Sequence, residues 1–431
     1  MNRTVSGTLS GTLAIMPSKS ASHRTVLLAS LSSGETILEP LLLSQDISAT
    51  LTCVQQLGLT RGVATMASEM PGFVRARILG RSRNEGKRIG RVLDCNESGS
   101  TLRFLIPLAL DGRGPVRFTG HGRLMQRPLD VYEAIMREQR LLWLQRGNEL
   151  TIDGLLNPGD YTLPGDVSSQ FITGLLLALP QLSGNSTISL STPLESRGYV
   201  ELTRKIQEQF GIVSEWRNDG QSLYIPGKQM PRSPGNVYIE GDWSHAAFYL
   251  TAGAIGGSGI TLYGLDPDST QGDKVILHFL HEMGAQIMIK DDAVTVLPSE
   301  LHSITADVSQ CPDLVPILAV AMAAAHGESR ITGAARLRLK ESDRLRSMAL
   351  ALQSLKAICY EQDDGLIIRG GLPLQSGTVE GCNDHRVVMS MAIASALARG
   401  PVTITDSEAV AKSAPAFWEE FTHLGGIIHE G

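Results

Sequence analysis

Basic residues stand at unusual places in this sequence, at or just before long apolar segments. Arginine binds carboxylate or phosphate groups through two parallel hydrogen bonds, and lysine supplies a compact positive charge. One charged cluster is usually only a solvated surface, but clusters that recur at equivalent places indicate a site for a small molecule with several negative charges. The clusters contain Lys19, Arg24, Arg103, Arg123, Arg127, Lys340, Arg344, Arg386 and Lys412.

Small polar residues begin the same apolar segments, as expected for helix N-caps. The first turn of a helix leaves backbone N–H groups unpaired and carries a partial positive charge, so helix N-termini suit bound anions. The sequence therefore predicts that several helices begin at one anion-binding site. The polar starts are residues 18–20, 97–100, 167–170, 241–244, 311–313 and 383–386.

The chain repeats one pattern six times, in which an apolar helical segment ends in a glycine turn and a strand follows. Successive turn glycines lie about 68 to 80 residues apart, which fits a repeated α/β subdomain. Each repeat carries a second, amphipathic helix, so one unit reads strand, helix, strand, helix, strand, strand. Such second helices are predicted at residues 46–57, 200–210, 273–283, 342–355 and 415–424, several of them ending at glycine.

Two places suggest a division into halves of three units each. Residues 231–236 form a cluster of helix- and strand-breaking residues between the third and fourth units. One arrangement considered for the first strand, near residues 8–15, is that it completes the sheet of the last unit. The chain would then cross between halves twice, near Pro17 and near Pro234, and a cleft between halves is a common ligand site.

Composition excludes several classes of protein. The chain has 431 residues and a formal net charge of −6, which argues against a nucleic-acid partner bound through bulk charge. The five cysteines are scattered and are expected to be reduced thiols in the cytoplasm. Residues 1–4 lack the apolar segment of a signal peptide, and the apolar segments are too short to span a membrane. We therefore expect a cytoplasmic protein with no membrane partner.

Ten motifs in register make the sequence resemble the 5-enolpyruvylshikimate-3-phosphate synthase family over essentially its whole length. They are residues 17–24, 96–103, 123–128 and 166–170, Ser196 with Tyr199, residues 271–273, 312–313, 340–344 and 383–386, and Lys412. The resemblance implies a two-domain inside-out α/β barrel with six βαβαββ units, three per domain. Residues 1–17 plus 238–431 would form the phosphoenolpyruvate-side domain and residues 18–237 the shikimate 3-phosphate-side domain, with the active site in the cleft between them.

The resemblance also implies the reaction. Enzymes of this family are 3-phosphoshikimate 1-carboxyvinyltransferases, which transfer the enolpyruvyl group of phosphoenolpyruvate to the 5-hydroxyl of shikimate 3-phosphate and release phosphate. This is the sixth step of chorismate biosynthesis in the shikimate pathway. The reaction is an addition and elimination through a tetrahedral intermediate, without metal or cofactor. We expect a monomer whose only partners are these two substrates.

Site residues are carried over motif by motif. The residues expected to bind shikimate 3-phosphate are Lys19, Ser20, Arg24, Ser168, Ser169, Gln170, Ser196, Tyr199, Asp313 and Lys340. The residues expected to bind phosphoenolpyruvate are Lys19, Gly99, Arg123, Gln170, Arg344, Arg386 and Lys412. Family roles make Asp313 the base near the 5-hydroxyl, with Glu341 and Lys19 as candidate proton carriers, so Lys19, Asp313 and Glu341 are the expected catalytic residues.

Some residues receive a plainer interpretation. His278 and His281 are expected to form an exposed pair on a helix rather than a metal site. Asp242 and Asp273 match family motifs, but helix capping explains them equally well. Three places depart from the common family pattern: Met16-Pro17, Arg336 in place of an asparagine, and Ser413-Ala414. Arg336 is therefore left out of the expected site.

Two other functions compete with the main interpretation. The first is an enolpyruvyl transferase acting on UDP-N-acetylglucosamine, which shares the fold and phosphoenolpyruvate. It is disfavoured because Ser20, and not asparagine, follows Lys19, and because residues 120–128 contain no cysteine. The second is a non-catalytic anion-binding relative, which the retention of Lys19, Asp313 and Glu341 together argues against.

Overall fold

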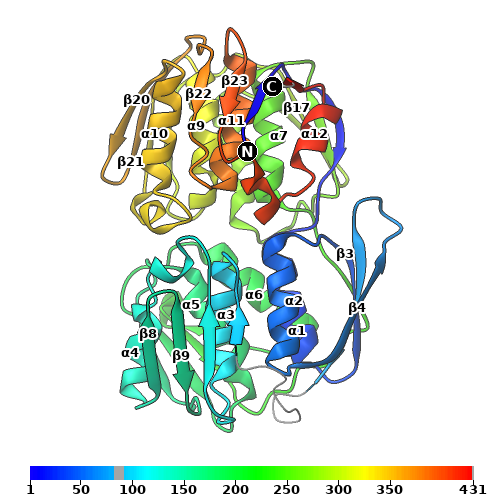
Figure 1. The fold of residues 1–431 in the computed structure, drawn as a ribbon, viewed down its shortest axis with the longest axis vertical. Helices are drawn as coiled ribbons and strands as arrows, with labels where there is room; N and C mark the ends of the chain where they lie inside the picture. Colours follow the sequence, from blue (N-terminus) through cyan, green and yellow to red (C-terminus); the bar gives the residue numbers. More distant parts are fainter. Residues whose placement is uncertain (82–91, 430–431) are drawn as a thin grey trace. The chain divides into compact units, whose positions relative to one another are not determined.

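Six four-stranded sheets, each with its own pair of helices, make up the described part of the chain. The computed structural model describes residues 1–81 and 92–429. In every sheet the first two strands of the repeat are parallel and the last two form an antiparallel pair, so the order in space is first, second, fourth, third. The sixfold βαβαββ repeat predicted from the sequence is confirmed (Figure 1).

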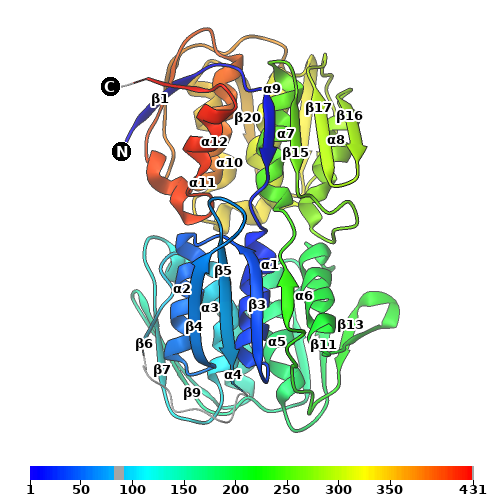
Figure 2. The ribbon, with the colours of Figure 1, turned by 90° about the vertical axis from the view of Figure 1, so that its right-hand side faces the viewer.

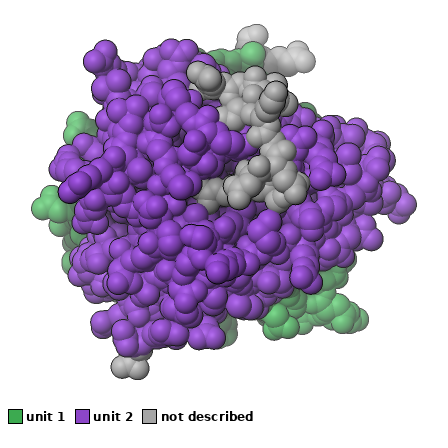
Figure 3. Space-filling model, turned by 90° about the horizontal axis from the view of Figure 1, so that it is seen from below, with its two compact units in different colours: residues 1–16, 240–431 green, residues 17–239 purple. Residues whose placement is uncertain are grey.

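The chain divides into two compact units. Unit 1 comprises Met1–Met16 and Glu240–Gly431, and unit 2 comprises Pro17–Ile239 (Figure 3). The chain therefore passes between the units twice, after Met16 and after Ile239.

Unit 2 contains three sheets with their helices. Its elements, sheet by sheet, are β14 (Asn236–Tyr238), α1 (Lys19–Leu31), β3 (Glu35–Leu41), α2 (Gln45–Gln56), β4 (Thr60–Ala67) and β5 (Val74–Gly80); β6 (Val92–Asp94), α3 (Gly99–Ala109), β7 (Val116–Thr119), α4 (Asp130–Glu138), β8 (Leu142–Arg146) and β9 (Glu149–Asp153); β10 (Asp160–Leu163), α5 (Ser169–Ala178), β11 (Ser186–Leu190), α6 (Arg197–Gln209), β12 (Glu215–Arg217) and β13 (Ser222–Ile225).

Unit 1 contains the other three sheets. Its elements are β2 (Gly11–Ala14), α7 (Trp243–Ile255), β15 (Ile260–Tyr263), α8 (Ile276–Glu282), β16 (Gln286–Lys290) and β17 (Ala293–Leu297); β18 (Thr305–Asp307), α9 (Val315–Ala324), β19 (Gly327–Thr332), α10 (Arg344–Ser354), β20 (Ile358–Gln362) and β21 (Gly365–Gly370); β22 (Gly377–Val379), α11 (His385–Ala394), β23 (Val402–Ile404), α12 (Phe417–His423), β24 (Ile427–His429) and β1 (Arg3–Ser6).

Short 3₁₀ helices supply several connections near the helix starts. They are η1 (Leu124–Gln126), η2 (Leu179–Gln181), η3 (Asn218–Gly220), η4 (Gly272–Val275), η5 (Pro312–Leu314), η6 (Ala335–Leu339), η7 (Ser395–Leu397) and η8 (Ser407–Lys412).

The two crossings exchange strands between the sequence halves, which corrects one expectation. Residues 8–15 do not complete the last sheet, because Arg3–Ser6 lies between β23 and β24 in that position. Strand β2 instead pairs in parallel with β15. Strand β14, just before the second crossing, pairs in parallel with β3 of unit 2, and Figure 2 shows β3, β5 and β4 side by side in that sheet. The strand before each crossing therefore pairs within the unit that the chain is about to leave. Strand β2 belongs to unit 1 and precedes the first crossing, and β14 belongs to unit 2 and precedes the second.

The first helix of each repeat is buried, as its apolar sequence predicts. In α9 every residue from Val315 to Ala323 is buried, and α7 is buried along almost its whole length. The amphipathic helices fall within a few residues of their predicted ranges, and the glycines after α2 and α8 adopt positive φ, +75° at Gly58 and +97° at Gly284. Only glycine takes this conformation without a steric cost, so these residues end their helices.

The cysteines and the apolar helices bear on two expectations from the sequence. All five cysteines are free thiols, and four of them are buried. Within residues 1–81 and 92–429, no helix has both the length and the apolar character needed to span a membrane.

Candidate active site

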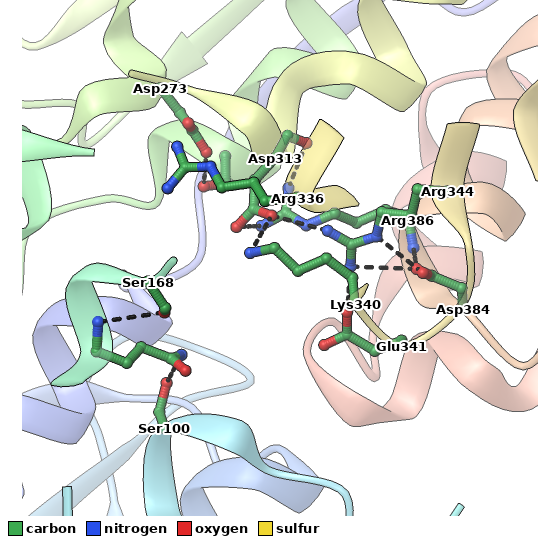
Figure 4. A network of polar contacts seen from close by, with 12 residues as sticks. Ser100, Ser168, Asp273, Asp313, Arg336, Lys340, Glu341, Arg344, Asp384 and Arg386 are labelled. Carbon is green, nitrogen blue, oxygen red and sulfur yellow. Dashed lines mark hydrogen bonds and ion pairs between the residues drawn. The ribbon is translucent and has the colours of Figure 1, made fainter. Parts of the chain in front are cut away.

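Arg344 is the centre of the charged cluster in unit 1. It is the first residue of α10, and its side chain is only 2% exposed. Its guanidinium contacts three carboxylates: Nη1 lies 2.7 Å from Asp313, Nη2 lies 2.7 Å from Glu341, and Nε lies 2.8 Å from Asp384 (Figure 4). Burial acts to lower the pKa of Arg344, but the carboxylates outweigh it and raise the pKa above its usual value. This guanidinium is therefore permanently charged.

Asp313 collects three cations. Besides Arg344, its carboxylate lies 3.5 Å from Lys340 Nζ and 3.3 Å from Arg386 Nη2, and Arg386 Nη1 donates to the Asp313 carbonyl at 3.1 Å. Burial acts to raise the pKa of Asp313, but the cations hold it well below its usual value. The carboxylate of Asp313 is therefore ionised at neutral pH.

The other two phosphoenolpyruvate-binding residues expected in unit 1, Arg386 and Lys412, lie at helix ends. Arg386 is the second residue of α11, and its backbone N–H donates to Oδ1 of Asp384, the N-cap residue, at 3.0 Å. Lys412 ends η8 and donates from Nζ to the carbonyl of Asn383 at 2.6 Å, next to the start of α11. The pKa of Lys340 is lowered, chiefly by burial. Lys340, Arg344 and Arg386 thus meet at Asp313, with Lys412 beside α11.

In unit 2, Lys19 and Arg24 lie on the first two turns of α1. Lys19 Nζ is 3.0 Å from a carboxylate oxygen of Asp46 on α2. Arg24 is buried, and its guanidinium donates to Thr203 and Thr173 hydroxyls and to the carbonyls of Ser20 and Tyr199. Burial lowers the pKa of Arg24 to about 10. Its positive charge remains at neutral pH, which suits a phosphate.

Gln170 connects two helix starts of unit 2. Its amide oxygen accepts from Arg103 Nη1 at 2.7 Å, and its amide nitrogen donates to Ser100 Oγ at 3.0 Å. Its backbone N–H donates to Ser168, the N-cap of α5 (Figure 4). The starts of α3 and α5 are thereby held together.

Gly99 lies beside a basic residue that the sequence reasoning did not select. A Cβ built on Gly99 would lie 2.8 Å from Arg127 Nη1 and 3.5 Å from Gln170 Oε1. Arg127 is 9% exposed, whereas the side chain of Arg123, the residue selected from the same motif, is exposed. The structure therefore brings Arg127 to the start of α3, in addition to the exposed Arg123 that the sequence selected.

The other expected residues of unit 2 lie at the starts of helices. Ser169 begins α5, and Ser196 is the N-cap residue of α6 with a left-handed φ of 55°. Tyr199 lies on the first turn of α6, and its ring is 6.0 Å from the guanidinium carbon of Arg24. Ser20 lies on the first turn of α1. All of these residues belong to the same unit as Lys19 and Arg24.

The sequence reasoning did not select Asp46 and Asp384 as partners of the basic residues. Asp384 stands inside the polar helix start predicted at residues 383–386, and it is the N-cap residue of α11. Asp46 carries no such signal, since its ion pair with Lys19 spans two helices. A sequence shows where charges stand but not which of them become partners.

Helix capping was predicted as the role of Asp242 and Asp273, and the structure agrees for only one of them. Asp242 caps α7 by accepting from the backbone N–H of His245 at 2.9 Å, as predicted. Capping is wrong for Asp273, which lies inside η4, is fully buried and accepts a hydrogen bond from Ser244 Oγ. His278 is exposed beside Glu282, and the described residues contain no cluster of three or more potential metal ligands.

Comparison with known proteins identifies the family. The family model of EPSP synthase, 3-phosphoshikimate 1-carboxyvinyltransferase, matches residues 4–421. Proteins named 3-phosphoshikimate 1-carboxyvinyltransferase are 44% identical over 432 residues in Clostridium novyi (98% of this chain and 97% of the relative) and 43% identical over 429 residues in Clostridium kluyveri (98% and 96%).

Solved structures agree. EPSP synthase from Acinetobacter baumannii matches with a TM-score of 0.81 and 26% identity, over 100% of both chains. The enolpyruvyl transferase NikO from Streptomyces tendae, at 17% identity, shares the fold with a TM-score of 0.76 over 99% of this chain and 98% of its own. The fold is the inside-out α/β type of the enolpyruvyl transferases. The chain belongs to the EPSP synthase family, the 3-phosphoshikimate 1-carboxyvinyltransferases.

Proposed function

We propose that this chain transfers the 1-carboxyvinyl group of phosphoenolpyruvate to the 5-hydroxyl of shikimate 3-phosphate and releases inorganic phosphate. Besides family membership, the observation that carries the proposal is the meeting of Lys340, Arg344 and Arg386 at the ionised carboxylate of Asp313. A base placed among cations suits a reaction in which a hydroxyl must be deprotonated beside an anionic co-substrate.

In this proposal each of the two substrates is bound by residues of both units. Phosphoenolpyruvate is bound by Lys19, Gly99, Arg123, Gln170, Arg344, Arg386 and Lys412, to which the contact with Gly99 adds Arg127. Shikimate 3-phosphate is bound by Lys19, Ser20, Arg24, Ser168, Ser169, Gln170, Ser196, Tyr199, Asp313 and Lys340. Within this set, the guanidinium of Arg24 is fixed by hydrogen bonds to hydroxyl and carbonyl oxygens of unit 2.

The chemistry balances in two steps. In the addition, Asp313 accepts the proton of the 5-hydroxyl, the hydroxyl oxygen bonds to C2 of phosphoenolpyruvate, and Glu341 or Lys19 gives a proton to C3. In the elimination, a proton passes from the new methyl group back to the Glu341 or Lys19 that supplied it, the double bond forms again, and the C2–O bond breaks so that phosphate leaves. Acid–base help contributes about 100- to 10,000-fold in rate, while positioning contributes roughly 7 to 11 kcal/mol. Positioning by the two sets of cations is the larger contribution.

We also propose that the protein acts in the cytoplasm, as a monomer and without metal. Five free cysteines suit a reducing compartment. Full activity in the presence of a chelator, and one monomeric species in solution during turnover, are the expected results.

The decisive experiment is a phosphate-release assay with each acceptor. Purified protein with phosphoenolpyruvate should release phosphate when shikimate 3-phosphate is added and not when it is omitted. Release with UDP-N-acetylglucosamine in its place would transfer the assignment to the other enolpyruvyl transferase. Binding of both substrates without phosphate release would indicate a non-catalytic relative.

A further inference from the structure

Asp384 is the most deeply buried charged group of the cluster in unit 1. Its exposed fraction is 0%, and it precedes α11 as the N-cap residue. Oδ1 accepts from the backbone N–H of Arg386 at 3.0 Å, and Oδ2 accepts from Ser342 Oγ at 3.0 Å. Both oxygens also contact Arg344, at 2.8 Å to Nε and 3.4 Å to Nη2. One carboxylate therefore touches α10, α11 and the turn before α10.

The N-cap of α11 does not by itself require a negatively charged residue such as Asp384. Serine caps α1, α3 and α5 through its hydroxyl oxygen. A buried carboxylate is costly unless a cation and hydrogen bonds compensate it. Burial acts to raise the pKa of Asp384, but Arg344 outweighs it and keeps the pKa below its usual value. The charge is thus matched to Arg344 rather than to the helix end.

The contact also decides which edge of Arg344 remains available. Asp384 takes the edge formed by Nε and Nη2. Nη1 is directed to Asp313, and the second hydrogen of Nη2 to Glu341. The side chains of Asp313 and Glu341 are 20% and 17% exposed, whereas that of Asp384 is fully buried. A ligand can therefore replace Asp313 or Glu341 on Arg344 but cannot replace Asp384.

We infer that Asp384 is a positioning residue for phosphoenolpyruvate, because it fixes the guanidinium of Arg344 and the backbone of Arg386 in one rigid arrangement. The inference rests on the proposed function, which assigns both arginines to phosphoenolpyruvate. Asp384 itself does not touch the substrate. Its contribution is to remove the conformational freedom that a long arginine side chain would otherwise lose on binding.

The test is the variant Asp384→Asn, which keeps the shape and a capping oxygen but removes the charge. A hydrogen bond to a charged group corresponds to about ten- to a hundredfold in affinity. The KM for phosphoenolpyruvate should rise by about that factor, while the KM for shikimate 3-phosphate stays within about twofold. A general loss of structure would move both constants, so this split separates positioning from stability.

Asp343→Asn is the matched control. Asp343 also caps a helix, accepting from the N–H of Arg346 at 3.1 Å, and it also pairs with an arginine, Arg338, at 3.0 Å. Asp343 is the N-cap residue of α10, the helix that Arg344 begins. Its carboxylate contacts Arg338 and the backbone of Arg346 instead of the guanidinium of Arg344. Both KM values of this variant should stay within about twofold of the original.

Three outcomes would decide the inference. An unchanged KM for phosphoenolpyruvate in Asp384→Asn, or an equal rise in both KM values, overturns it. If Asp384→Asn does not fold, Ser342→Ala removes only the hydroxyl donor to Asp384, and its KM for phosphoenolpyruvate must rise alone. Equilibrium binding of phosphoenolpyruvate to the original chain and to the variant gives the same comparison without turnover. Failure of the phosphate-release assay would therefore be distinguished from failure of this inference.

Discussion

At the scale of single residues, Asp313 forms ion pairs with two arginines, Arg344 and Arg386, that bind phosphoenolpyruvate in the proposed function. Its carboxylate contacts Arg344 at 2.7 Å and Arg386 at 3.3 Å. An incoming carboxylate or phosphate must compete with this internal anion. Release of Asp313 from the arginines would also move its lowered pKa upward, toward a value at which it accepts a proton more readily.

The variant Asp313→Asn therefore has two opposite expected effects. Turnover should fall by about 100- to 10,000-fold, because the base is lost. Phosphoenolpyruvate should bind more tightly, by a factor of about ten, because the competing charge on Arg344 and Arg386 is gone. Equilibrium dialysis measures the binding. Glu361→Gln, which removes a carboxylate paired with Arg338 in the same unit, is the control and should change neither quantity. Weaker binding in Asp313→Asn would contradict the competition.

Asp273 is a buried carboxyl group with an unusual titration. Burial, followed by the charge of Asp313, raises its pKa to about 6, against the attraction of Arg386 and the hydrogen bond from Ser244. In the unfolded chain the group would titrate near 3.8. Between these two values the folded state binds more protons than the unfolded state, so this group lowers the stability as the pH rises.

The variant Asp273→Asn should therefore be more stable than the original chain above pH 6. The expected gain in the free energy of unfolding is on the order of 1 to 3 kcal/mol at pH 7.5. The gain should shrink as the pH falls below about 6 and should vanish below 3.8, where the carboxyl group is protonated in both states. Urea unfolding of both proteins at pH 5 and 7.5 measures the difference. A gain that is independent of pH would show that packing, and not ionisation, is responsible.

At the scale of elements, helices α3 and α5 approach closely at one glycine. A Cβ on Gly174 would lie 2.1 Å from Tyr132 Oη and 2.5 Å from the carbonyl oxygen of Arg103. The Tyr132 hydroxyl lies within hydrogen-bond distance of the carbonyls of Arg103 and Phe171, at 2.9 and 3.0 Å. This contact sets the spacing of the two helices whose starts carry Gly99 and Gln170.

The variant Gly174→Ala should accordingly damage both stability and the site. The new methyl group meets backbone atoms that cannot turn away, so the free energy of unfolding should fall by about 1 to 3 kcal/mol. The separation of α3 and α5 should also raise the KM for phosphoenolpyruvate. Thermal unfolding and steady-state kinetics measure these effects. Gly62→Ala is the control, since a Cβ there has open space, and equal effects of both variants would refute the argument.

The elements themselves were largely predictable, because their signals are local. Apolar periodicity located α2, α6 and α10, and glycines with positive φ follow α2 and α6, whereas Lys356 takes that conformation after α10. Strand exchange was not predictable. Whether β2 pairs with β15 or completes the last sheet depends on partners about 250 residues away in the sequence, and no local pattern records that choice.

The same distinction applies to the site. The positions of Lys19, Arg344 and Arg386 were recognisable, because basic residues at the starts of apolar helices are unusual. Their carboxylate partners were not, because the pair of Arg344 and Asp384 spans 40 residues and two helices. Arg127 was passed over for Arg123, since the sequence does not show which of two nearby arginines the turn at η1 buries.

At the scale of the whole molecule, the proposed reaction needs residues from both units. Lys19, Gly99 and Gln170 belong to unit 2, whereas Arg344, Arg386 and Asp313 belong to unit 1. The chain passes between the units at only two places, Met16–Pro17 and Ile239–Glu240. Two short connections permit a hinge motion, so substrate binding is expected to change the arrangement of the units.

Solution X-ray scattering tests this last expectation. The radius of gyration should decrease when shikimate 3-phosphate and phosphoenolpyruvate are both present, because each substrate then contacts basic residues of both units. These contacts favour the closed arrangement and offset the entropy lost when the units are fixed relative to each other. Arg344→Gln, which removes a phosphoenolpyruvate ligand from unit 1 alone, should bind shikimate 3-phosphate yet show a smaller decrease. An equal radius for the free and the doubly liganded protein would mean that the residues of the two units already meet without motion, and the hinge would have no role in turnover.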